Sequence, residues 1–301
     1  MIEAISLYNT ATKQKVDLNM YASPDDCYLD YVDWGTIQGT HHEYKFANQV
    51  GTYVTSTSLG NRDVEIVGFL VARTDQEMTD LKNFYNLFVN PQQEIEITYE
   101  DYVLRFLPDT TIRYGVKYEE SNDKICKFKI SGYCPDPLFA DKDDSAVEAA
   151  TTVGMFHFPL AISDNPNPPG GVMFGLRTPS MFSVVTNKGD VSTGMKIVFK
   201  AFGAVVNPYL VNVKTQEFFK VNKTMRAGEE IEIETTIGKK YIRGKFNRTT
   251  SNYFKYRDLD SSWLQLEVGD NVFRYGSDDD VELLEVYIYF QNKYLEVQEC
   301  K

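Results

Sequence analysis

Short apolar runs, each ended by turn-forming residues, fill the segment 184–241. Val, Ile and Phe recur there between polar residues, and Asn, Gly, Asp or Pro closes each run. Runs of this kind, with turn residues every ~8 to 12 positions, are typical of antiparallel strands in a β-sandwich. Ile231 and Ile233 alternate with three glutamates and are expected to face inward. The expected strands are 196–199, 209–213, 218–221 and 230–234.

Chain length and composition extend this interpretation to the whole protein. At 301 residues and 34.5 kDa, the chain exceeds the usual size of a single core, so two domains are expected. Its 20 tyrosines and 19 phenylalanines favour strands, because aromatic side chains suit a half-buried pleated surface. The expected fold class is mainly β with one helix.

That helix is predicted at residues 74–90. Thr74 and Glu77 have the spacing of a capping box, and Asn90 precedes a proline that stops the helix. An apolar stripe is expected to pack on the protein's own sheet rather than to fill a partner's groove. The stripe consists of Met78, Leu81, Phe84, Tyr85, Leu87 and Phe88.

The same patterns place the domain boundary. A strand is expected at 64–71, a hairpin at 94–106 and a half-exposed strand around 126–130. Pro135 and Pro137 then fix extended geometry. We therefore predict one domain at 1–139 and a second at 140–301, with 163–171 as a long loop on the second domain.

Charge and motifs exclude several functional classes. The net charge of −12 and the pI near 4.8 argue against specific nucleic-acid binding. No signal peptide is expected, and no apolar run approaches the roughly 20 residues that span a bilayer, so no membrane insertion is expected. The four scattered cysteines predict free thiols, with disulfide or zinc pairing left as alternatives.

No familiar catalytic motif is present, so no enzyme, cofactor or metal is expected, although a catalytic set assembled only in space stays open. The pair His41–His42 lacks a third ligand at suitable spacing, and His157 is expected to face solvent on a strand. Asp278, Asp279 and Asp280 predict a solvated hairpin loop, with a calcium site as the alternative.

Five sequence segments carry a family resemblance. They read CPDPLF (134–139), FHFPL (156–160), TNKGDVSTGMKIVFKAFGAVVNP (186–208), TMRAGEEIEIETTIGKK (224–240) and SSWLQLEVGDNVFRY (261–275). In this order, the segments make the chain resemble the distal tail proteins of long, non-contractile-tailed bacteriophages.

The resemblance implies a baseplate hub located in the virion and synthesised in the cytoplasm of the host bacterium. Its first domain would be a tail-tube-like β-sandwich or barrel that closes into a homohexameric ring, and its second a galectin-like β-sandwich. The ring would join the tail tube protein to the tail-associated tip protein and could carry receptor-binding proteins. DNA would pass through the ring without specific binding, which agrees with the acidic charge.

Mixed polar and aromatic residues make the hairpin at 94–106 and the segment 41–53 candidate ring contacts, because edge strands need partners. These candidates are His41, Tyr44, Tyr53, Tyr99, Tyr102 and Phe106. The alternative function is a carbohydrate-binding tail module that recognises host surface glycans by aromatic stacking. Its candidate residues are Trp263, Tyr253 and Tyr256, although a core role is favoured for Trp263.

Overall fold

The computed structural model describes residues 2–21, 27–48, 50–115, 124–148, 151–154, 175–178 and 182–297. The chain forms two compact units. Unit 1 runs to Asp143 and takes up the chain again from Lys293, whereas unit 2 spans Asp144–Asn292. Unit 1 therefore includes the C-terminal segment, which the sequence had assigned to the second domain. Within the described ranges, no helix is long and apolar enough to cross a membrane.

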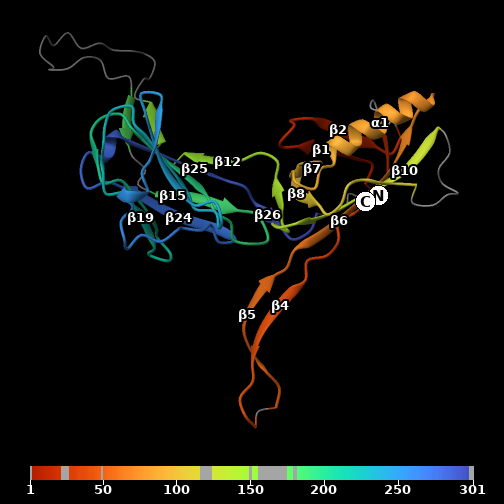
Figure 1. The fold of residues 1–301 in the computed structure, drawn as a ribbon. Coiled ribbons are helices and arrows are strands. Elements are labelled where there is room, and N and C mark those ends of the chain that lie inside the picture. Colours follow the sequence, from red (N-terminus) through yellow and green to blue (C-terminus); the bar gives the residue numbers. More distant parts are fainter. Residues whose placement is uncertain are drawn as a thin grey trace, which may run out of the picture. The chain divides into compact units, whose positions relative to one another are not determined.

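Seven strands of unit 1 close into a barrel (Figure 1). Their order is β8-β7-β1-β2-β3-β6-β10, and β10 pairs back to β8 through Gly132↔Pro108 and Tyr133↔Leu107. A Cβ on Gly132 would lie 2.4 Å from the Phe106 ring and 2.5 Å from the Leu107 carbonyl oxygen, so the closure requires glycine. The barrel strands are β1 (Ala4–Asn9), β2 (Lys15–Asn19), β3 (Cys27–Asp33), β6 (Arg62–Val71), β7 (Ile95–Tyr99), β8 (Tyr102–Pro108) and β10 (Ile125–Cys134).

Three short strands extend the barrel sheet, and two longer ones form a separate hairpin. The short strands are β9 (Arg113–Tyr114), β11 (Phe139–Asp141) and β26 (Lys293–Tyr294). The hairpin strands are β4 (Gly39–Tyr44) and β5 (Tyr53–Leu59).

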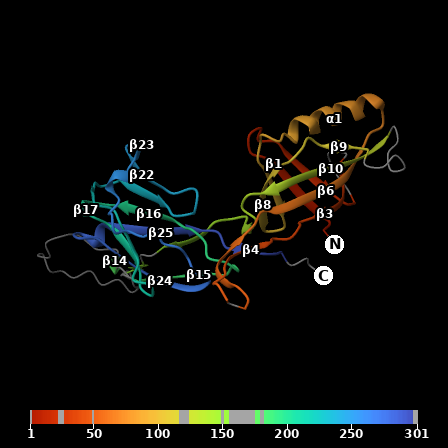
Figure 2. The ribbon, with the colours of Figure 1, turned by 60° about the horizontal axis from the view of Figure 1, so that its bottom comes forward.

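Helix α1 (Asp75–Phe88) covers part of the barrel (Figures 1 and 2). Thr74 accepts a hydrogen bond from the Glu77 amide, and the Glu77 side chain accepts one from the Thr74 amide, which confirms the predicted capping box. Met78, Tyr85 and Phe88 are buried, and the Tyr85 ring stacks on Phe128 of β10 at 6.1 Å.

The predicted apolar stripe on this helix was too wide. Leu87 is 74% exposed and Phe84 is 36% exposed, because they lie on the flank of the helix that faces away from the barrel. The buried face is thus narrower than the sequence spacing indicated.

Unit 2 is a two-layer β-sandwich. One sheet has the order β12-β25-β16-β21-β22-β23 and the other β15-β24-β18-β19. Ile231 and Ile233 of β21 are fully buried, as predicted, and they belong to the same core as Phe219 and Phe273 of the opposite sheet. These layers are β12 (Ser145–Glu148), β15 (Phe182–Asn187), β16 (Lys196–Ala201), β18 (Tyr209–Asn212), β19 (Phe218–Lys220), β21 (Glu230–Glu234), β22 (Tyr241–Phe246), β23 (Thr249–Asn252), β24 (Gly269–Gly276) and β25 (Leu284–Phe290).

The remaining elements of unit 2 are short. They are β13 (Thr151–Gly154), β14 (Gly175–Thr178), β17 (Val205–Val206), β20 (Thr224–Met225) and the 3-10 turns η2 (Phe254–Tyr256) and η3 (Val281–Leu283). The expected loop at 163–171 and His157 lie outside the described residues. The mainly β architecture with a single α-helix in the described ranges confirms the predicted fold class.

Candidate assembly and binding surfaces

The hairpin formed by β4 and β5 extends away from the barrel and is here called the arm (Figure 1). Its strands pair only with each other in the part of the chain that the structure describes, from Gly39↔Leu59 to Tyr44↔Tyr53. Every residue of both strands is exposed. The arm therefore gains almost no burial from unit 1.

Large apolar side chains are nevertheless concentrated on the arm. Val50 is completely exposed, and the rings of Tyr44 and Phe46 meet edge to face at 4.6 Å. An isolated two-stranded hairpin is at best marginally stable in water, and exposed apolar patches mark interaction sites. The exposed apolar residues of the arm are Tyr44, Phe46, Val50, Tyr53, Val54 and Leu59.

Three of the six candidate ring residues lie on the arm. Tyr44 and Tyr53 face each other across the two strands and are 56% and 63% exposed. His41 pairs with Thr57, and its Nδ1 lies 2.9 Å from the Thr57 hydroxyl. These three side chains are available to a partner surface.

The other three candidates are placed differently. Phe106 is fully buried in the barrel core, and Tyr99 is 6% exposed and packs against Trp34 at 5.9 Å. Tyr102 is half-buried, with its ring 5.3 Å from that of Tyr294. Phe106 and Tyr99 cannot contact a neighbouring copy through their side chains, because the alternation of β7 and β8 points them into the barrel.

The carbohydrate candidates also make contacts within their own unit. The Tyr253 hydroxyl donates to the Glu229 carboxylate at 2.8 Å, and the Lys223 ammonium lies 5.1 Å from the Tyr253 ring and 5.9 Å from that of Tyr256. Burial, followed by this hydrogen bond, raises the pKa of the Tyr253 phenol to about 12. Tyr253 thus supports the sandwich instead of offering a free ring.

Trp263 is half-buried between the core and two cations. Its ring lies 5.1 Å from that of Phe219, 5.3 Å from the Lys240 ammonium and 5.5 Å from the Arg257 guanidinium. A sugar that stacked on this ring would have to displace at least one of these neighbours. The geometry therefore favours a packing role for Trp263, in line with the sequence expectation.

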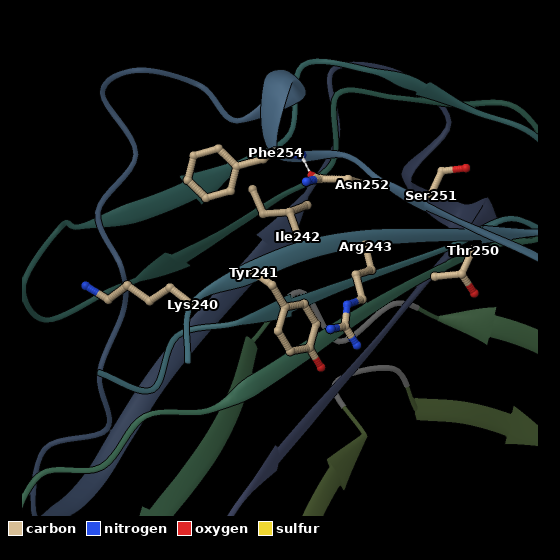
Figure 3. A pocket seen from close by; sticks show the side chains of 8 residues that line it. All are labelled: Lys240, Tyr241, Ile242, Arg243, Thr250, Ser251, Asn252 and Phe254. Carbon is tan, nitrogen blue, oxygen red and sulfur yellow. Dashed lines mark hydrogen bonds between the residues drawn. The ribbon is translucent and has the colours of Figure 1, made fainter. Parts of the chain in front are cut away.

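A shallow pocket of about 280 Å³ lies close to this cluster, at the edge formed by β22 and β23 (Figure 3). In it, the Arg243 guanidinium stacks 4.1 Å from the Tyr241 ring, and the Asn252 side chain accepts a hydrogen bond from the Phe254 amide at 2.8 Å. Its lining residues are Lys240, Tyr241, Ile242, Arg243, Thr250, Ser251, Asn252 and Phe254. None of the carbohydrate candidates lines this pocket.

The acidic loop before η3 is held by protein groups. Asp278 accepts hydrogen bonds from Asn207 at 2.8 Å and from Lys220 at 2.9 Å. The bonds from Asn207 and Lys220 hold the pKa of the Asp278 carboxyl below its usual range. One member of the expected aspartate run is therefore committed to a structural role, which favours a hairpin loop over a calcium site.

Sequence reasoning missed several exposed arm residues. Phe46 and Val50 lie within the candidate segment 41–53 but were not named singly, and Val54 and Leu59 were not selected, because alternation alone does not distinguish a strand that packs from a strand that projects. Their common signal is that apolar residues occur on both faces of a short hairpin.

Comparisons with known proteins point to one family. Residues 188–294 match the model of the siphovirus-type tail component, C-terminal domain. The solved structure of the SPP1 Dit (gp 19.1) protein has 12% sequence identity and a TM-score of 0.65, with 96% of this chain and 98% of that chain covered. A chain of the phage P2 baseplate, in its activated conformation with Ca, has 11% identity and a TM-score of 0.55, with 99% and 100% covered. No curated protein sequence gives a significant match.

The barrel and the sandwich together have the fold of these two phage chains. Residues 188–294 are thus similar to the C-terminal domain of siphovirus-type tail components, and the chain shares the fold of the SPP1 Dit protein over 96% of its length. The family resemblance noted in the sequence is thereby confirmed.

Proposed function

We propose that six copies of the chain form a ring at the distal end of the tail tube, and that the arm of each copy contacts its neighbour. The observation that carries this proposal is the arm itself. Its two strands are exposed along their full length, and the hairpin as a whole bears six large exposed apolar side chains, four on the strands and two in the turn. Cyclic rings use interfaces in which one surface of a copy meets a different surface of the next. A projecting hairpin suits such an interface.

The proposed ring connects the tail tube protein to the tail-associated tip protein. Receptor-binding proteins would attach to the sandwich, and DNA would pass through the centre. A net charge of −12 on each copy supports a passage that does not retain the phosphate backbone. The contact residues proposed on the arm are His41, Tyr44 and Tyr53.

Light scattering over a range of concentrations tests the ring. The expected mass of the assembled form is six times the 34.5 kDa of one chain. A variant with Tyr44→Ser, Phe46→Ser and Tyr53→Ser is expected to stay monomeric with an unchanged unfolding temperature, because the three side chains are exposed.

The matched control carries Tyr21→Ser and Leu87→Ser, two exposed apolar residues of unit 1 outside the arm. It should assemble like the unmodified chain. An arm variant that assembles as readily as this control would refute the arm contact. A closed assembly of another size would refute the hexamer.

A further inference from the structure

Arg62 is the first residue of β6, directly after the arm, and it is fully buried. Its guanidinium lies 4.8 Å from the centre of the Phe139 ring. A buried arginine is tolerated only where its donors are paired, because an unpaired charge in the interior is strongly unfavourable. The partners of Arg62 are therefore informative.

These partners come from three segments that are far apart in the sequence. Trp34 and Gly35 lie just before the arm, Pro137 lies in the segment that leaves the barrel, and Leu295 and Glu296 lie in the segment that returns to it. The bonds run to the carbonyl oxygens of Pro137 (2.8 Å), Trp34 (3.2 Å), Gly35 (3.4 Å) and Leu295, and to both carboxylate oxygens of Glu296 (3.2 and 3.3 Å).

The returning segment, residues 293–297, is docked by further contacts. β26 pairs with β11 through Phe139↔Tyr294, and the Lys293 ammonium lies 2.7 Å from the Asp136 carboxylate. Val297 is 8% exposed and belongs to the barrel core. The segment thus extends the barrel sheet and contributes to its core, although it follows unit 2 in the sequence.

The root of the arm lies at the same place. The Gly60 amide donates to the Gln38 carbonyl at 2.7 Å and closes the hairpin at its base. Trp34, which precedes the first strand of the arm, packs edge to face against Phe139 with ring centres 5.3 Å apart. Arg62 follows the second strand of the arm, and its side chain contacts the segment before the arm and the two segments that lead to and from unit 2.

We propose that Arg62 and residues 293–297 form a clamp that fixes the root of the arm, so that the direction of the arm depends on docking of the C-terminal segment. Arginine suits this role because its planar fork donates in several fixed directions, whereas lysine supplies one compact ammonium. The inference concerns the attachment of the arm and holds whichever surface the arm contacts.

Hydrogen exchange on the full chain tests the clamp. Arg62→Lys and Glu296→Gln are expected to speed exchange at the Gly60 amide and in β26 by about tenfold, since bonds to a charged group are lost. Amides of β1 and β7, on the far side of the barrel order, should keep their rates. Glu296 is 59% exposed, so its substitution leaves the core composition unchanged even if Arg62→Lys impairs folding.

Arg105→Lys is the matched control, because the Arg105–Glu96 pair at 3.0 Å joins neighbouring strands of the same barrel away from the arm. It should leave exchange at Gly60 unchanged. Release of residues 293–297 without faster exchange at Gly60 would refute the clamp. Exchange that becomes faster to the same extent at all barrel amides would also refute the clamp, since Arg62 would then stabilise the barrel as a whole like any other core residue.

Discussion

The Lys223 ammonium lies 2.8 Å from the carboxylate of Glu229, a residue that is only 1% exposed. Burial alone would raise the pKa of Glu229, but hydrogen bonds from Lys223, from the Tyr253 hydroxyl and from the Arg226 amide together lower it below 4.5. A carboxyl with a lowered folded-state pKa stabilises the native state above its unfolded pKa. This stabilisation is lost as the pH falls through the folded-state value.

The first prediction follows from this pair. Glu229→Gln should lower the free energy of unfolding of unit 2 by about 3 kcal/mol at neutral pH, because it leaves the Lys223 charge without its partner. The difference from the unmodified chain should shrink as the pH falls below about 4.5. Urea unfolding of both proteins from neutral pH to below pH 4.5 measures this difference in stability. A difference that does not change with pH would contradict a lowered pKa for Glu229.

A second prediction uses stability to distinguish the candidate ring residues that lie in the barrel core from those that lie on the arm. Phe106→Ala should destabilise unit 1 by about 3–5 kcal/mol, because it removes a fully buried ring. Tyr44→Ala should change stability by no more than about 0.5 kcal/mol. Denaturant unfolding followed by Trp34 fluorescence in a Trp263→Phe background reports unit 1, since the chain has two tryptophans. Equal losses of stability in the two variants would contradict the burial of Phe106 in the core and the exposure of Tyr44 on the arm.

A third prediction concerns the closure of the barrel. Gly132→Ala places a methyl group against Phe106 and the Leu107 carbonyl, so it should cost about 1–3 kcal/mol by overpacking. Gly39→Ala on the arm is the control, because its nearest contact would be 3.6 Å away. The same fluorescence assay compares them. A neutral Gly132→Ala variant would show that β8 and β10 separate easily.

A fourth prediction concerns the thiols. Cys27, Cys126 and Cys134 are buried, and burial raises the pKa of the Cys134 thiol to about 12. The thiolate is the reactive form, so these three residues should resist alkylation at neutral pH until the protein unfolds. Mass spectrometry of iodoacetamide-treated native and urea-unfolded protein tests this. Rapid native labelling of Cys134 would contradict its burial.

The fifth prediction addresses the carbohydrate alternative. Trp263→Ala should destabilise unit 2 by about 3 kcal/mol, because the ring packs on Phe219. A glycan array probed with the unmodified chain and with Phe254→Ala, an exposed neighbour of Trp263, distinguishes packing from recognition. Glycan binding that is lost in Phe254→Ala while stability is kept would favour the carbohydrate function.

Local patterns predicted the elements well. Thr74 and Glu77 cap the helix because a capping box involves residues only three apart, and Ile231 and Ile233 are buried because alternation needs only one strand. These features depend on short stretches of chain, and a short stretch of sequence is sufficient to encode them.

The features that were missed depend on distant residues. Nothing near Gly132 indicates that β10 pairs with β8 as well as β6, and nothing near Glu296 indicates a partner at Arg62, 234 positions away. Phe106 and Tyr53 occur in similar mixtures of polar and aromatic residues, yet one is in the core and the other on the arm. Such differences are set by which strands meet, and local alternation does not encode this.

The pairing of Phe139 with Tyr294 has an evolutionary consequence. Unit 2 lies between these two residues in the sequence, so the chain leaves the barrel sheet and returns to it at one pair of hydrogen-bonded strands. Neighbouring chain ends of this kind can be joined to another domain without strain. Unit 2 is thus inserted into the chain of unit 1 and could be exchanged as one module. A lineage of such proteins could therefore exchange one sandwich for another while the barrel is kept.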